Sequence, residues 1–184
     1  TVQSESRTYY AVCFYEVQSK TAAETVRDDI ISSGGSGYVI CSGAYKVYGG
    51  MYAKRSEADV VASRQSNAFV ETLGWKQSKI GFSSRAEATN VKNALSFYCG
   101  VADKLVESAS LIVKEEESSV AVKSYAAAAR KKFSEYSASI SDEKLSLLFE
   151  RAAVSINTLA ECDDADFLSV LRYVAQDLVV LRGT

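Results

Sequence analysis

The chain has 184 residues, of which 47% are hydrophobic and 24% are charged, and it contains no apolar run of 18 residues or more. These values are typical of a globular protein of one or two domains and exclude a membrane-spanning helix in this segment. The 21 basic and 23 acidic side chains give a formal net charge of −2, so nucleic acid is not an expected partner.

Composition also excludes most catalytic classes. The sequence has no histidine, which removes the most frequent general base, the Ser-His and Cys-His nucleophile pairs and the most frequent zinc ligand. No G-x-S-x-G motif is present, and no pair of carboxylates stands in a recognisable loop setting for glycosidase chemistry. We therefore expect a protein that is not an enzyme, with no catalytic residue, no metal and no cofactor.

The four cysteines, Cys13, Cys41, Cys99 and Cys162, are far apart and form no C-x-x-C motif. This spacing encodes neither a zinc site nor a thioredoxin-type motif. Cysteine is among the most buried residue types, so we expect buried free thiols, with a disulfide or a reactive thiol as the alternatives.

The N-terminal part begins with a strand signal and a helix signal. Residues 8–15 are rich in aromatic and β-branched side chains, which predicts a strand. Residues 20–33 have helical apolar spacing, with a cap at Ser19 or Thr21 and a stop at the glycine pair that follows.

A hairpin, a second helix and a last strand are predicted next. Residues 37–41 and 44–52 are two strands joined by a turn at Ser42 and Gly43. A short helix opens near Ser56, and residues 68–75 form a further extended run. The predicted order is therefore βαββαβ, an antiparallel sheet with helices on one face in ferredoxin-like order.

The rest of the chain is predicted to be all-helical. The chain has no proline, which favours long helices, and four apolar stripes follow one another at helical spacing. The stripes begin at Val91, Val122, Leu145 and Phe167 and end at Ile112, Tyr136, Leu159 and Leu181. Caps are expected at Ser84, three residues before Glu87, and at Ser141 or Asp142. The fold class is thus α+β, with an α+β domain over residues 1–82 and a helical domain of about four helices over residues 83–184.

Short motifs in the N-terminal part resemble a known family. Residues 45–52 follow the pattern Tyr-x-Val-x-x-Gly-x-aromatic, and the charged pair Lys54 and Arg55 precedes Glu57-Ala58. This half is similar to the SPOR domain, the sporulation-related repeat that binds bacterial peptidoglycan. The first half fits less well, because Cys13 stands where the family often has Gln and Tyr15 where it often has Gly. Residues 81–88 echo the same half-repeat, which leaves the end of the second half open.

Strand alternation places a set of candidate site residues on one face of the sheet. Tyr10, Val12 and Phe14 would lie under the helices with Val47, and the next residues along each strand face the other way. An open face of several tyrosines, a lysine and a glycine suits a shallow carbohydrate platform, because rings pack on sugar faces while hydroxyls and a lysine bond glycan oxygens. The candidate glycan-binding residues are Tyr9, Cys13, Tyr15, Lys46 and Tyr48. The alternative is that the C-terminal helices cover this face.

The resemblance implies a function. It predicts a non-catalytic bacterial cell-envelope protein that binds peptidoglycan glycan strands through the open sheet face and acts in sporulation or cell division. The alternative is a protein-interaction scaffold in which the helical domain docks a protein partner and the sheet is only structural. An enzyme of cell-wall turnover is the weakest hypothesis.

The resemblance and the start of the chain also predict a location. The implied ligand lies outside the cytoplasm, in the cell envelope or septum. The chain begins with Thr1 and carries no signal segment, so we expect a piece of a longer precursor. Membrane contact is expected only through an anchor that precedes Thr1.

Overall fold

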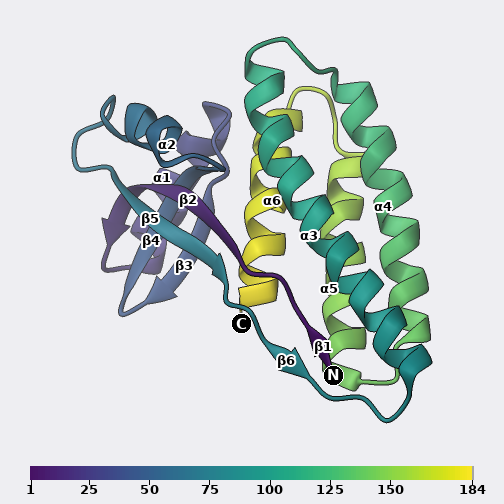
Figure 1. Ribbon diagram of the computed structural model, residues 1–184. Coiled ribbons are helices and arrows are strands. Elements are labelled where there is room, and N and C mark those ends of the chain that lie inside the picture. Colours follow the sequence, from purple (N-terminus) through teal and green to yellow (C-terminus); the bar gives the residue numbers. More distant parts are fainter. Residues whose placement is uncertain (184) are drawn as a thin grey trace.

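The structure is a computed structural model that describes residues 1–183, and it has mixed α+β architecture (Figure 1). The strands are β1 (Val2–Gln3), β2 (Arg7–Val17), β3 (Tyr38–Ser42), β4 (Ala44–Tyr52), β5 (Phe69–Trp75) and β6 (Lys79–Ile80). The helices are α1 (Lys20–Ser32), α2 (Arg55–Ala62), α3 (Arg85–Val113), α4 (Ser119–Ser139), α5 (Glu143–Glu161) and α6 (Phe167–Gly183). The predicted α+β class is confirmed.

The main sheet is antiparallel, with the strand order β3-β4-β2-β5. A second sheet, which the sequence did not predict, pairs β1 with β6 through Val2 and Ile80. Each of these two strands is only two residues long, so neither shows the alternation from which a strand is recognised. This short ladder holds the N-terminus beside the segment that leads into α3 (Figure 1).

Four helix starts are fixed by local capping, and the three caps that the sequence predicts are among them. The backbone N–H of Ala22 donates to Ser19 Oγ at 3.2 Å, that of Glu87 to Ser84 Oγ at 3.1 Å, and that of Leu145 to the Asp142 carboxylate at 2.9 Å. Each cap satisfies a backbone donor that the helix leaves free, and a cap of this kind is worth about 0.5–2 kcal/mol. The structure thus selects Ser19 over Thr21 and Asp142 over Ser141.

The helices cover both faces of the main sheet. On one face, Ala23 and Ile30 of α1 pack on Val47 and Phe14, and α2 lies beside them against β2 and β5. On the other face, Ala11 belongs to a large core that continues into the four long helices. In Figure 1, α6 (yellow) lies between the sheet and the other long helices. One hydrophobic core therefore spans both parts of the chain.

The predicted apolar stripes form the centre of this core. Tyr98, Phe133 and Phe149, from α3, α4 and α5, are fully buried, and their ring centroids lie 5.4–6.1 Å apart. Tilted and edge-to-face contacts of this kind stabilise the core beyond simple area burial. The Tyr98 hydroxyl donates to the carbonyl of Leu178 at 2.7 Å, which ties α3 to α6.

A line of polar contacts fastens α6 to the sheet part, and we call it the α6 seam. Ser169 Oγ donates to the carbonyl of Ile31 at 3.1 Å, and Arg172 donates to that of Gly34 at 2.6 Å. Further along α6, the Tyr38 hydroxyl donates to Asp177 at 2.9 Å. These bonds fix the position of α6 against α1 and β3.

The four cysteines are free thiols. Cys13 and Cys99 are buried, as predicted, and Cys162 is half-buried. The prediction is wrong for Cys41, which is exposed because it lies near the end of the edge strand β3. Within residues 1–183, no helix combines the length and the apolar character that crossing a membrane requires.

Candidate functional site

The predicted carbohydrate platform is mostly covered. Tyr9, Cys13 and Tyr48 are only 3%, 0% and 1% exposed, because the long helices pack on this face of the sheet. The Tyr9 hydroxyl donates to Asp103 of α3 at 2.6 Å, and burial together with this bond raises the pKa of Tyr9. These three side chains belong to the core, so the alternative in which helices cover the face describes this structure.

Tyr15 lies on the opposite face from the other predicted site residues, which corrects the sequence-based placement. Cys13 is paired with Tyr48 and Tyr15 with Val47, so Phe14 has no partner and forms a β-bulge. The extra residue shifts the alternation of side chains along the strand. Residues directly opposite each other share a face, so Tyr15 lies with Val47 on the α1 side, where it is 39% exposed.

The sequence did hold a signal for this irregularity. Gly49 is also unpaired, because Val12 is opposite Gly50 and Cys13 is opposite Tyr48. A Cβ on Gly49 would lie 2.5 Å from the Phe14 ring, so the two bulged positions fit together only with glycine at one of them. A glycine inside a strand pattern often marks a bulge. The Gly49-Gly50 pair therefore indicates from sequence that the alternation of side chains along this strand is interrupted by a bulge.

Lys46 is the predicted site residue that stays accessible on the expected face. Its ammonium group bonds one oxygen of Glu71, and the Tyr48 hydroxyl donates to the other. The Lys46 Nζ atom also lies 5.6 Å from the centroid of the Phe69 ring, in cation–π range. Glu71 was not predicted as a site residue, although its place in the last strand of the sheet was.

The electrostatics of this cluster are set by opposing effects on Glu71. Burial alone would raise the pKa of the carboxyl, but the hydrogen bonds from Lys46 and Tyr48 outweigh it and hold the pKa below its ordinary value. The bond to Glu71 raises the pKa of Lys46 against the opposing effect of burial. Both groups are therefore charged at neutral pH.

These residues belong to the part of the sheet face that the helices leave accessible, and we call it the uncovered strip. Ile40 is directly opposite Lys46, and Lys46 is directly opposite Glu16, so the three cross neighbouring strands at one level. Phe69 and Glu71 continue the strip on β5. Glu16 is exposed and the other four are half-buried. The strip offers an apolar ring edge, an ammonium group and two carboxylates, which can bind a polar ligand with many hydroxyl groups.

The bonds that Lys46 and Tyr48 make to Glu71 should make the stability of the fold depend on pH. Because the folded-state pKa of Glu71 is lowered, its ionised form stabilises the folded state above the ordinary value of 4.5, and this stabilisation is lost as the pH falls below it. We expect the difference in unfolding free energy between wild type and Glu71→Gln to be constant near neutral pH and to shrink below pH 4.5. Urea denaturation at a series of pH values measures it.

The control for this titration is Glu107→Gln. Glu107 is exposed on α3 and forms no ion pair within the described part of the chain. A Glu71→Gln difference that does not change with pH would contradict the bonds that Lys46 and Tyr48 make to Glu71.

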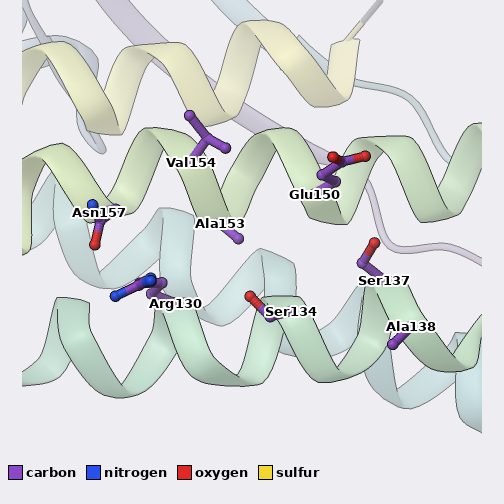
Figure 2. A pocket seen from close by; sticks show the side chains of 8 residues that line it. All are labelled: Arg130, Ser134, Ser137, Ala138, Glu150, Ala153, Val154 and Asn157. Carbon is purple, nitrogen blue, oxygen red and sulfur yellow. The ribbon is translucent and has the colours of Figure 1, made fainter.

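A second surface feature is a polar groove of about 410 Å³ between α4 and α5 (Figure 2). Arg130 and Ser134 line it from α4, and Asn157, Val154 and Glu150 line it from α5. In Figure 2 the Arg130 side chain extends beneath Asn157, and Val154 points away from α4. Arg130 and Glu150 are not paired among the described residues, and no hydroxyl stands beside a base. The groove has the character of a seam between neighbouring helices, lined by polar and apolar side chains.

Comparisons of the chain with family models, with curated proteins and with solved structures found no match.

Proposed function

We propose that the protein is a non-catalytic cell-envelope module that binds peptidoglycan glycan strands through the uncovered strip. The observation that supports this most is the strand order β3-β4-β2-β5, with α1 and α2 on the face opposite α6. This arrangement supports the βαββαβ, ferredoxin-like order that the SPOR resemblance implies. With this function the protein acts outside the cytoplasm, at the envelope or septum, in sporulation or cell division.

The chemistry of the strip suits a sugar polymer. The Phe69 ring can pack on the apolar face of a sugar ring, since aromatic side chains combine a large contact area with a rigid shape. The carboxylates of Glu16 and Glu71 accept hydrogen bonds from sugar hydroxyls, and Lys46 donates to glycan oxygens or to an acidic substituent. The strip crosses all four strands of the main sheet, so it fits an extended glycan strand better than a small compact ligand.

Retention on purified sacculi tests the proposal. Phe69→Ala should weaken retention about fivefold, since the loss of one stacking contact is worth about 1 kcal/mol. Lys46→Gln should also weaken it, because a donor to the glycan is removed.

The control for retention is Tyr15→Ala, which truncates an exposed ring on the opposite face of the same sheet. This variant should bind sacculi as wild type does. Equal losses for Tyr15→Ala and Phe69→Ala would contradict binding through the strip, and so would a wild-type protein that sacculi do not retain.

The second candidate function is a protein-interaction scaffold, and the burial of Tyr9, Cys13 and Tyr48 favours it. With these residues in the core, the sheet acts mainly as a packing layer for the helices. Leu147 and Val154 are exposed apolar side chains two turns apart on α5, so they share one face of that helix. If sacculi do not retain wild type, this candidate replaces the first, and polar substitutions at both positions should then abolish partner binding.

A further inference from the structure

A pocket of about 570 Å³ lies where the sheet part meets the ends of the long helices, and we call it the junction pocket. Phe14 and Ile30 line it from the sheet and α1, Val60 and Val61 from α2, and Val113 from the end of α3. Its volume falls within the range of about 300–1,000 Å³ that is typical of small-molecule sites. It thus brings apolar side chains from elements far apart in the sequence to one concave surface.

The charged groups of the junction pocket are mostly positive. Arg64, Lys114 and Arg172 line it together with one carboxylate, Glu57. None of the three cations has a carboxylate oxygen within 4.0 Å among residues 1–183. Arg172 instead donates to the carbonyl of Gly34, which fixes the guanidinium group at the pocket. The pocket therefore has an excess of positive charge that the described residues do not neutralise.

Two hydrogen-bond donors of the pocket lining, Tyr52 and Arg172, lie close to one point beside Gly50. A Cβ placed on Gly50 would lie 3.6 Å from Tyr52 Oη and 3.7 Å from Arg172 Nε, so both donors are close to the same point. The Tyr52 hydroxyl makes no hydrogen bond to another described residue. Burial raises the pKa of Tyr52, so this hydroxyl keeps its proton at neutral pH and can donate. A guanidinium group and a phenol side by side match the two oxygens of a carboxylate.

We propose that the junction pocket binds a small amphipathic anion, a medium-chain acyl carboxylate, with the carboxylate on Arg172 and Tyr52 and the chain against Phe14, Ile30 and Val61. Arg64 and Lys114 add long-range attraction at the mouth of the pocket. Phe14 and Gly49 belong to the α1 side of the sheet, so this site lies on the face opposite the uncovered strip. The two proposals are therefore independent.

Calorimetric titration of the full chain with octanoate tests this proposal, with octanol and octylamine as neutral and cationic probes of equal length. We expect saturable binding of octanoate, at least tenfold weaker binding of octanol, and no binding of octylamine. Octanoate should not displace the protein from sacculi. Octanoate that binds no better than octanol, or that shows no saturable binding below its aggregation concentration, would overturn the proposal.

Variants locate the site. Arg172→Gln and Tyr52→Phe should each weaken octanoate binding about tenfold, which is about 1.4 kcal/mol per group. Gly50→Ala should weaken it as well, because the added methyl group would lie 3.6 Å from Tyr52 Oη and 3.7 Å from Arg172 Nε, beside both donors and at ordinary contact distances that leave the fold intact. Arg130→Gln, in the α4–α5 groove, is the matched control and should bind octanoate as wild type does.

A second variant tests the site if Arg172→Gln does not fold because its bond to Gly34 is lost. The double variant Arg64→Gln, Lys114→Gln changes only exposed side chains and should weaken binding and reduce its salt dependence. Unchanged affinity in both this variant and Tyr52→Phe would place octanoate elsewhere and overturn the proposal.

Discussion

Tyr48→Ala is expected to lower the free energy of unfolding by about 3–5 kcal/mol, the range for removal of a buried aromatic ring. The Tyr48 ring is among the largest fully buried side chains, and it packs in the core that joins the sheet to the long helices. Its hydroxyl is one of two donors that hold the Glu71 carboxylate. Alanine therefore leaves a cavity and also removes a bond to a charged group. Strand alternation with an open sheet face would instead predict that the fold tolerates Tyr48→Ala, because the ring would lie outside the core.

Tyr48→Phe separates the two contributions. It keeps the ring and removes only the hydroxyl, so we expect a smaller loss of about 1.5–3 kcal/mol, the value of a hydrogen bond to a charged group. Urea denaturation followed by fluorescence measures both variants, because Trp75 is the only tryptophan and lies beside Tyr9 in the same core. If Tyr48→Ala were as stable as Tyr48→Phe, the ring would not be buried.

Gly74→Ala is expected to destabilise the fold by about 3 kcal/mol or more, since backbone strain alone costs about 1–3 kcal/mol. Gly74 has φ of +147°, which L side chains rarely adopt, and it is paired with Thr8 in the β2–β5 ladder. An added Cβ would lie 2.0 Å from the carbonyl oxygen of Arg7, a backbone atom that can move only if the strand moves. The variant should therefore disrupt the end of the sheet where β5 meets β2.

Gly100→Ala is the matched control with the opposite expected sign. Gly100 lies exposed in the middle of α3, and nothing would contact its added Cβ within 4 Å. Alanine in a helix interior is favoured over glycine by about 0.8–1.0 kcal/mol, so this variant should be more stable than wild type. Thermal and urea denaturation of the two variants give the comparison. A Gly74→Ala protein with wild-type stability would mean that the register of β5 on β2 is different.

The helices were predictable because their signals are local. An apolar stripe that recurs every three or four residues, together with a cap such as Ser84, specifies a helix and its buried face within one segment. Tyr98 could therefore be assigned to the core from sequence alone. The strands β2 to β5 were found in the same way, from short runs of aromatic and β-branched residues.

The candidate site was less predictable because it depends on contacts between distant segments. Whether Tyr9 faces solvent is decided by Asp103, which is 94 residues away in the sequence. The position of Tyr15 depends on a single bulged residue, Phe14, which reverses the faces of all the residues beyond it. The link between Glu71 and Lys46 requires the sheet order, which alternation within one strand does not contain.

The α6 seam has a consequence for synthesis of the protein. The helix α6 follows all the other described elements in chain order, so the inner face of the sheet lacks the cover of α6 until residues 167–183 have emerged from the ribosome. During that interval Ala11, Cys13 and Tyr48 form an apolar surface that is open to other chains, and such surfaces promote aggregation. Folding of the N-terminal strands should therefore be completed late. A nascent chain that stops before α6 should be sensitive to protease throughout the sheet part, residues 1–82.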